Sequence, residues 1–393
     1  MHKQALVIGS GPSGLMAADM LSAAGIPVTI AEAKPSAGRK FLMAGKSGLN
    51  ITKDENFESF LQSFYDRQTP LHPILEAFQS KDVIGWAHEL GLKTFIGSTK
   101  RVFPEAMKAS PLLRAWLSKL SKQEVRLQTK WRWIHGDGRA FVFDTPDGLR
   151  TLYPDVTILA LGGASWPKLG SDGAWTSWFA GKNIPITPFT PCNVAIDVNW
   201  SPHMITQFGK PLKAVAFLTS NRKVRGEAVI SEKGLEGGGI YEITRDLRQN
   251  QDLKIDLLPD WSVEKIANAL SKPKGKLSQS NFWRKALKLG PEKQALLHEF
   301  GHPLPIQALD LAKLMKSLFV QNEGLRPIEE AISTGGGIPF DAMDAGLMLK
   351  SMPGVFCVGE MLDWEAPTGG YLISAALATG RWAGVNAMDY LMK

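Results

Sequence analysis

Ala5-Leu6-Val7-Ile8-Gly9-Ser10-Gly11-Pro12-Ser13-Gly14 is the stretch of this 393-residue chain that decides its fold. Residues 5–8 are all apolar, which predicts a buried parallel strand. Beyond it, Gly9 permits a tight turn, Gly11 lets the backbone approach a pyrophosphate, and Gly14 allows a helix to pack closely on the strand. The apolar pattern of residues 15–21 then predicts a helix whose first N–H groups face the phosphates.

A second strand and an acidic residue follow at the spacing of a nucleotide-binding unit. Residues 27–31 predict the strand, and Glu32 lies 18 residues after Gly14, where a carboxylate accepts hydrogen bonds from ribose hydroxyls. Residues 156–161 predict another buried strand, which ends in the doublet Gly162-Gly163 and so leaves room for a dinucleotide. These features predict an α/β protein with a Rossmann-like nucleotide-binding domain.

The carboxyl end of the chain carries the second half of the predicted site. An apolar strand at 354–358 leads into Gly359 and Glu360, with Asp363 just beyond. Then come Gly369-Gly370-Tyr371 and a helix, predicted from Leu372 to Met388, that is rich in Ala, Ser and Gly. Backbone N–H groups from Gly370 to Ile373 are expected to face a ring system. A glycine loop coupled to such a segment favours FAD over free NAD.

The predicted FAD-binding domain is discontinuous, covering residues 1–187 and 331–393. Residues 188–257 hold short alternating stretches that suit a small antiparallel sheet or barrel, and 258–330 are expected to form a helical insert. Inside the first segment we predict helices over 56–90 and over 110–120, the latter opened by Ser110 as cap. Strands over 125–134 and 140–145 are expected to form a hairpin.

Composition and residue spacing argue against several other classes of protein. The sequence shows no apolar run long enough to span a membrane and no room for a signal peptide before Ala5. We therefore expect a cytoplasmic protein. Cys192 and Cys357 are too few for a disulfide framework or a zinc site, and no histidine has metal-ligand spacing, so no metal site is expected. The net charge is +7, and residues 265–293 hold eight Lys or Arg against Glu292 alone.

Six motifs make the chain resemble a known family, the bacterial NAD(P)/FAD-dependent oxidoreductases of the BaiN-like group, which are related to bile-acid reductases. The resemblance covers essentially the whole chain. It implies a glutathione-reductase-like FAD domain with a small β-barrel insert and a helical insert. The motifs are GSGPSGLMAA (9–18), GRKFLMAGKSGLNIT (38–52), RVFPEAMKAS (101–110), LALGG (159–163) followed by GSDG (170–173), STGGGI (333–338) and FCVGEMLDWEAPTGGYLISAALATG (356–380).

Together, the pattern and the resemblance give the expected cofactor-binding residues. The resemblance places Arg39 and Lys40 near the phosphates, Glu360 at the ribityl chain and the 369–371 turn at the isoalloxazine. Asp363 matches a second acid just beyond Glu360. Commoner members have a cysteine where this chain has Leu49, so a mechanism that needs that thiol cannot operate here. The full expected set is Gly9, Gly11, Pro12, Ser13, Gly14, Glu32, Ala33, Arg39, Lys40, Asn50, Gly162, Gly163, Gly359, Glu360, Asp363, Gly370, Tyr371 and Ile373.

The sequence names no catalytic acid or base and no oligomeric state. Lys46, Asn50 and Thr52 are expected on a loop that reaches the flavin ring, Arg101 is a candidate for binding an anionic substrate, and Trp364 is a candidate edge of the flavin pocket. We expect an FAD-dependent oxidoreductase that reduces an unsaturated or carbonyl-containing small molecule, with NADH or NADPH as a transient reductant. The glycine clusters at 237–239 and 335–337 lack the helix and acid of a second dinucleotide motif.

Two alternatives stay open. The basic helical insert, with Phe282 and Trp283 among its cations, suits an RNA-binding or tRNA-modifying flavoprotein, although such a run is more often a solvated helical face. The other alternative is an oxygen-dependent flavin oxidase.

Overall fold

The computed structural model describes residues 3–45 and 48–393, and the chain divides into two compact units. The first contains residues Met1–Thr190 and Ser333–Lys393, and the second contains Pro191–Ile332. Each unit has its own hydrophobic core. Among the described residues, no helix combines the length and the apolar character needed to cross a membrane.

A five-stranded parallel sheet forms the centre of the first unit. Its strands β1 and β10 are fully buried, which explains why they are continuously apolar rather than alternating. The sequence order reverses between β1 and β10, and this creates a topological switch point at the carboxyl edge of the sheet. The order across the sheet is β20 (Val355–Cys357), β10 (Val156–Leu159), β1 (Ala5–Ile8), β2 (Val28–Glu32) and β6 (Arg126–Thr129).

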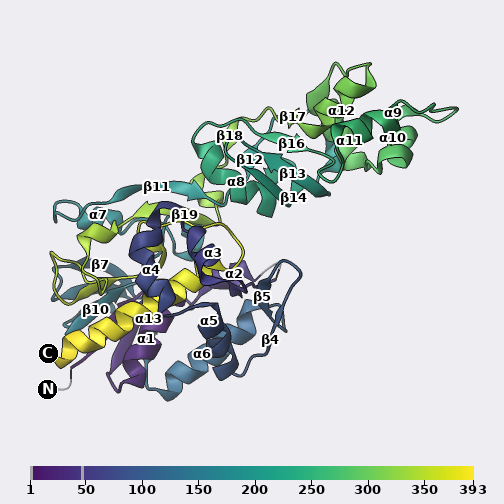
Figure 1. The fold of residues 1–393 in the computed structure, drawn as a ribbon. Helices are drawn as coiled ribbons and strands as arrows, with labels where there is room; N and C mark the ends of the chain where they lie inside the picture. The colour runs from purple at the N-terminus through teal and green to yellow at the C-terminus, as the bar shows by residue number, and fades with distance from the viewer. Residues whose placement is uncertain (1–2, 46–47) are drawn as a thin grey trace. The chain divides into compact units, whose positions relative to one another are not determined.

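Helices α1 (Pro12–Ala23) and α13 (Tyr371–Met392) lie side by side in this unit (Figure 1). Glycines on α13 make the contact close, because a Cβ atom built at Gly380 would lie 2.2 Å from the Ser13 carbonyl oxygen and one at Gly384 would lie 3.1 Å from that of Ala17. The small residues of α13 thus bring the carboxyl-terminal segment onto the glycine loop at the other end of the chain.

Short helices and small sheets complete the first unit. Two of its sheets are antiparallel, β3–β5–β4 and β7–β8–β9, and β11 pairs with β19. The helices are α2 (Arg39–Ala44), α3 (Phe57–Gln62), α4 (Gln68–Glu76), α5 (Ser80–Glu89), α6 (Ala109–Lys122) and α7 (Thr176–Phe179), and the strands are β3 (Thr52–Lys53), β4 (Thr94–Ile96), β5 (Arg101–Pro104), β7 (Arg132–Gly136), β8 (Phe141–Thr145), β9 (Gly148–Leu152), β11 (Thr187–Cys192) and β19 (Ser333–Gly337).

The structure corrects two element boundaries. The segment expected as one strand over 125–134 is divided between β6 and β7, because Lys130 between them has a φ of 60°. Helix α6 begins at Ala109 with Lys108 as its N-cap, so Ser110 lies inside the first turn and does not cap the helix.

The second unit is built on an antiparallel sheet covered by helices (Figure 1). The sheet order is β17 (Leu318–Phe319), β16 (Lys254–Asp256), β13 (Pro211–Leu218), β14 (Lys223–Ser231), β15 (Gly234–Glu236), β12 (Ile196–Asp197) and β18 (Gly324–Leu325). Its helices are α8 (Gly238–Arg248), α9 (Val263–Leu270), α10 (Gln279–Leu287), α11 (Pro291–Gly301) and α12 (Ala308–Lys316).

The expected fold class is confirmed: a Rossmann-type domain with a parallel sheet is interrupted by an insert that contains an antiparallel sheet and helices. Inside the insert, β17 and β18 come from the segment expected to be helical and complete the same sheet. The expectation that the 237–239 glycine cluster precedes no helix is wrong, since α8 begins at Gly238 directly after β15. That cluster packs against the sheet, because a Cβ atom at Gly239 would lie 2.2 Å from the Phe217 ring.

Candidate FAD site at the carboxyl edge of the parallel sheet

The residues expected to bind a nucleotide lie mainly on segments that follow the carboxyl ends of four parallel strands. These segments follow β1, β2, β10 and β20. Because the carboxyl ends of parallel strands meet at one edge, residues separated by more than 300 positions come together there. This edge, at a topological switch point, is where open α/β sheets bind ligands.

In the glycine loop after β1, only one of the three glycines, Gly11, has free space where a side chain would begin. A Cβ atom built at Gly9 would lie 2.2 Å from the Ala160 carbonyl oxygen, and one at Gly14 would lie 2.1 Å from that of Gly9. Gly9 also has a φ of +102°. At Gly11, in contrast, no heavy atom lies within 4 Å of the Cβ position, and φ is −74°. Gly9 and Gly14 therefore serve the fold, whereas the space at Gly11 is available to a ligand.

Helix α1 presents its amino end to this loop. Gly11 is the N-cap, Pro12 occupies the first turn, and no side chain caps the helix. Ser13 is buried. An uncapped helix start combines N–H donors with the positive end of the helix dipole, which suits a phosphate.

Glu32 ends β2 with its carboxylate turned toward the glycine loop. One carboxylate oxygen accepts hydrogen bonds from Ser10 N at 3.1 Å and Ser10 Oγ at 2.5 Å, and the other accepts one from Lys34 N at 2.8 Å. These bonds hold the carboxylate in one orientation beside the loop. Ala33, between Glu32 and Lys34, is exposed.

Arg39 lies in the first turn of α2, next to the glycine loop, because Gly38 N donates to the Ser10 carbonyl oxygen at 3.1 Å. Its Nη1 donates to Ser36 Oγ at 3.2 Å. Its Nε is buried and has no hydrogen-bond partner among residues 3–45 and 48–393. A buried guanidinium nitrogen without a partner is costly, and an anionic oxygen would satisfy it.

Lys40 and Glu360 join the two ends of the chain. Lys40 Nζ lies 2.5 Å from Glu360 Oε2 and donates to Ser165 Oγ at 2.7 Å, while Thr334 N donates to Glu360 Oε1 at 3.0 Å. Gly163 approaches this group so closely that a Cβ atom there would lie 1.9 Å from Thr334 Oγ1 and 3.2 Å from the Glu360 carboxyl carbon. Ser165 and Thr334 were missed from the sequence, although both stand beside glycine motifs.

Gly162 and Gly359 also lie at close approaches. A Cβ atom at Gly162 would lie 3.2 Å from Ser171 Oγ, which is buried and has no hydrogen-bond partner in the described part of the chain. One at Gly359, where φ is +75°, would lie 2.4 Å from Ser13 Oγ. Gly359 thus brings Glu360 next to the start of α1.

Asp363 and Trp364 are held within the protein. The Asp363 carboxylate pairs with Arg67 at 2.5 Å and accepts a hydrogen bond from Thr187 Oγ1 at 3.0 Å. The Trp364 indole is buried, and its Nε1 donates to the Gly359 carbonyl oxygen at 2.8 Å. Both side chains therefore have partners that fix the segment carrying Glu360.

The turn before α13 lies against β3. Gly370, with a φ of +108°, is the N-cap, and a Cβ atom there would lie 2.4 Å from the Thr52 carbonyl carbon. Ser374 Oγ donates to Thr52 Oγ1 at 2.9 Å. Two further expected residues are partly buried: Ile373, which directly precedes Ser374, and Asn50, which lies two residues before Thr52. Leu49 is fully buried. Lys46, also expected on this loop, lies outside the described residues.

Tyr371 is the centre of a charged cluster that sequence analysis missed. Its hydroxyl donates to Glu55 Oε1 at 2.6 Å and accepts from Lys53 Nζ at 2.7 Å, and Lys53 pairs with Glu55 at 3.0 Å. Burial acts to lower the pKa of Lys53, but its bonds to Tyr371 and Glu55 outweigh burial and raise that pKa above 10.5. Burial, and next the bond to Glu55, raise the pKa of Tyr371.

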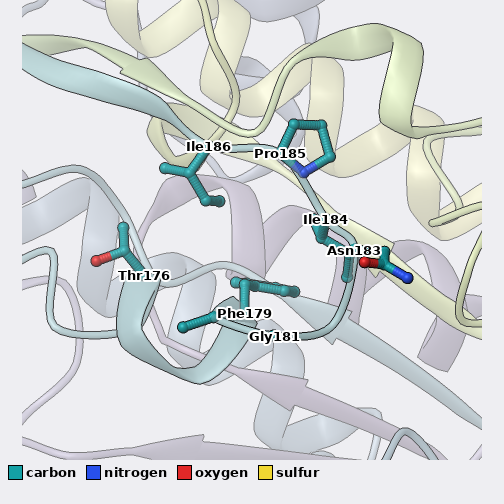
Figure 2. A pocket seen from close by; sticks show the side chains of 8 residues that line it. Thr176, Phe179, Gly181, Asn183, Ile184, Pro185 and Ile186 are labelled. Atoms are coloured by element: carbon teal, nitrogen blue, oxygen red, sulfur yellow. The ribbon is translucent and has the colours of Figure 1, made fainter.

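A separate hollow is lined by residues that lie between Ser171 and Thr187 in the sequence. Figure 2 shows it formed by α7 and the segment after it; of the cofactor-binding residues expected above, none lines it. Its lining consists of Thr176, Phe179, Ala180, Gly181, Asn183, Ile184, Pro185 and Ile186.

Sequence comparisons place the whole chain among known proteins. The family model described as HI0933-like protein Rossmann domain matches residues 3–386. A 3-dehydro-bile acid delta(4,6)-reductase from Clostridium scindens is 26% identical over 410 residues, covering 98% of this chain and 98% of the relative. A ribosomal RNA dihydrouridine synthase from Escherichia coli is 23% identical over 401 residues, covering 96% of each.

Solved structures share the fold. A flavocytochrome c3 fumarate reductase matches with a TM-score of 0.55 and 16% identity, over 100% of this chain and 79% of the other. A 3-ketosteroid-delta4-(5alpha)-dehydrogenase from Rhodococcus jostii matches with a TM-score of 0.51 and 14% identity, over 98% of this chain and 96% of the other. The expected enzyme class, an FAD-dependent oxidoreductase with a Rossmann-type nucleotide-binding fold, is confirmed.

Proposed function

The chain belongs to the HI0933-like Rossmann-domain family, and we propose that it reduces a carbon–carbon double bond conjugated to a carbonyl in a small molecule. FAD is the proposed cofactor, and NADH or NADPH is the proposed reductant. The structural observation that carries the assignment of FAD is the open cradle at Gly11, bordered by an uncapped helix start and by the Arg39 segment.

This cradle fits the pyrophosphate and adenosine parts of FAD. The space at Gly11 admits phosphate oxygens, and the unpartnered Nε of Arg39 is a donor for one of them. Glu32, held by Ser10 and Lys34, is oriented to accept from ribose hydroxyls. At the other end, the Lys40–Glu360 pair is suited to the ribityl hydroxyls, since a carboxylate accepts and an ammonium donates.

When bound, FAD supplies hydride transfer, and the protein supplies binding and orientation. The start of α13 directs backbone N–H groups of Tyr371 to Ile373 toward the turn at Gly369 and Gly370, where the ring is proposed to lie. No side chain caps this helix start, so its first N–H groups are not bonded by a capping side chain. The positive end of the helix dipole therefore favours negative charge at this turn.

The relatives support the reaction class. Both printed names, a delta(4,6)-reductase acting on a 3-dehydro-bile acid and a dihydrouridine synthase, denote saturation of a ring double bond conjugated to a carbonyl. Such a reduction adds a hydride to one carbon and a proton to the other. Leu49 is fully buried and has no ionisable hydrogen, so the proton must come from another group.

A nicotinamide donor is proposed to dock transiently at the flavin. The second unit offers no Rossmann-type cradle at its glycine cluster, because β15 pairs antiparallel with β12 and β14 and Gly239 is packed on Phe217. A Rossmann-type site for a nicotinamide dinucleotide has a parallel strand–loop–helix arrangement instead.

The test is an anaerobic titration in two steps. NADH and NADPH are added separately to the purified protein, and bleaching of the flavin absorbance reports reduction. The reduced protein is then mixed with 2-cyclohexenone, with cyclohexanone, or with oxygen. We expect one nucleotide to reduce the flavin and only cyclohexenone, among the two ketones, to reoxidise it quickly. Reoxidation by oxygen alone, with hydrogen peroxide as product, would instead identify an oxidase.

RNA modification is the second candidate, favoured by the exposed cations of the insert and by the name of the Escherichia coli relative. The exposed cations are Lys265, Lys272, Lys274, Lys276, Arg284, Lys285 and Lys288. Against it, Phe282 and Trp283 are buried, so neither ring is available to stack on a base, and buried Lys293 donates to the carbonyl oxygens of Ala214 and Leu257.

A further inference from the structure

The small sheet β3–β5–β4 has a face that the cofactor assignment leaves unexplained. Lys53 lies directly opposite Arg101, and Phe95 lies directly opposite Phe103. Opposite residues of an antiparallel pair share a face, and residues two apart on one strand share it too. We call Lys53, Phe95, Arg101 and Phe103 the β5 face.

Two aromatic rings form one end of the β5 face. The rings of Phe95 and Phe103 are stacked, with centroids 5.5 Å apart and planes inclined by 23°. Phe95 is 41% exposed, which leaves its ring available to another flat group. A Cβ atom at Gly48 would lie 3.9 Å from Phe103, so this end adjoins the segment that precedes Asn50.

The other end of the β5 face carries two cations with different surroundings. Lys53 is neutralised by Glu55 at 3.0 Å and bonded to the Tyr371 hydroxyl. Arg101 pairs with no carboxylate among the described residues. Its Nε lies 3.4 Å from the position that a Cβ atom would take at Gly369, beside the turn that precedes α13.

We propose that the β5 face binds the substrate, with Arg101 holding an anionic carboxylate group and the Phe95–Phe103 stack holding an adjoining planar apolar part. This inference rests on the proposed function for the location of the flavin ring at the 369–370 turn. A guanidinium matches a carboxylate with two parallel N–H donors, and an aromatic surface favours a flat conjugated group. The preferred substrate is therefore an anionic conjugated acid rather than a neutral ketone.

The probes are trans-cinnamate and cinnamamide, which share the ring and the conjugated double bond and differ in the charge. Each is titrated into the FAD-loaded full-length protein, and the change in the flavin spectrum gives its dissociation constant. We expect cinnamate to bind about tenfold more tightly than cinnamamide, as one charge-assisted pair provides. Arg101→Gln removes that preference, whereas Lys100→Gln, at the exposed neighbouring residue, keeps it.

Phe95→Ala provides a second arm, since an exposed ring can be removed without opening the core. It weakens cinnamate and cinnamamide alike, because both lose the same stacking surface. Equal binding of the two probes to the unmodified protein, a preference that survives in Arg101→Gln, or no spectral response to cinnamate would each overturn the inference. A protein without flavin, or one that neither nucleotide reduces, would instead contradict the proposed function, so the two failures are distinguishable.

Discussion

At the scale of single residues, the glycines of the first loop divide by what surrounds them. Gly9 and Gly14 face backbone atoms of the sheet and loop, so a side chain at either would displace the fold. Gly11 faces open space with an ordinary backbone φ. A side chain at Gly11 is therefore compatible with folding and incompatible with a ligand in that space.

Gly11→Val is expected to fold and to lose FAD. The valine methyl groups occupy the space proposed for the pyrophosphate, and we expect at least about a hundredfold weaker retention, equivalent to about 2.7 kcal/mol. Flavin absorbance after gel filtration measures retention, and circular dichroism measures folding. Gly85→Val is the matched control, because no heavy atom lies within 4 Å of its Cβ position either. A yellow Gly11→Val protein would refute the role of this loop.

The sequence is informative about residues where backbone geometry restricts the choice of side chain. Four glycines of the predicted motifs stand where a Cβ atom would collide with neighbouring protein atoms, as the motifs predict. They are Gly9, Gly14, Gly163 and Gly359. The partners of Glu360 were less predictable. Thr334 reaches Glu360 through its backbone N–H, which any residue provides, so its identity carries no signal.

At the scale of elements, the start of α13 is tied to β3 by the Tyr371, Lys53 and Glu55 cluster. The Tyr371 ring also packs against Phe60 and Phe64, with centroids 5.0 and 6.2 Å away. This cluster fixes the turn proposed to face the flavin ring. The stabilisation that the cluster gives to the folded protein should therefore depend on pH in the range where Tyr371 and Lys53 lose their protons.

Tyr371→Phe is expected to lower the free energy of unfolding by about 1–2 kcal/mol at pH 8, as loss of buried hydrogen bonds does. The folded-state pKa values of Tyr371 and Lys53 lie above their ordinary values of 10.0 and 10.5. Their contribution is therefore complete below those ordinary values and is lost as pH rises through the folded-state values. The difference between the two proteins should shrink above pH 10.0.

Urea unfolding at a series of pH values measures this difference, and Tyr153→Phe, at a position 68% exposed, is the control. A difference that is constant with pH would contradict the role assigned to the Tyr371 hydroxyl.

Element predictions succeeded where apolar runs are strong, as for the buried strands β1 and β10, and failed where backbone geometry decides. The cap expected at Ser110 is wrong, because helix α6 begins one residue earlier, at Ala109. Helix α8 was missed because it begins with two glycines, which have low helix propensity and suggest a turn. Strands β17 and β18 contain only two residues each and exist through pairing with distant strands, so their local sequence gives little signal.

At the scale of the whole molecule, the chain consists of a nucleotide-binding unit and an inserted unit with a separate core. The exposed loop of residues 271–278 in the insert carries Lys272, Lys274 and Lys276. If the insert only presents a solvated basic surface, neutralising these lysines affects RNA binding without affecting reduction of a small molecule.

The triple variant Lys272→Gln, Lys274→Gln and Lys276→Gln is therefore expected to keep the rate of reoxidation by cyclohexenone. Its RNA affinity should depend less on salt, with a slope reduced by up to roughly 0.7 for each lost phosphate contact on single-stranded RNA. Filter binding at several salt concentrations measures the slope. Faster reoxidation of the reduced flavin by a ribosomal RNA fragment than by cyclohexenone would favour RNA modification as the function.

We propose that the two ends of this chain together form an FAD site. The most direct measurement is the identity and amount of the flavin released when the purified protein is denatured, determined by chromatography against FAD and FMN standards. We expect FAD, at one molecule per chain, because Glu32 and the Gly11 cradle are placed for the adenosine and pyrophosphate that FMN lacks. Release of FMN, or a protein that neither contains nor takes up FAD, would contradict it.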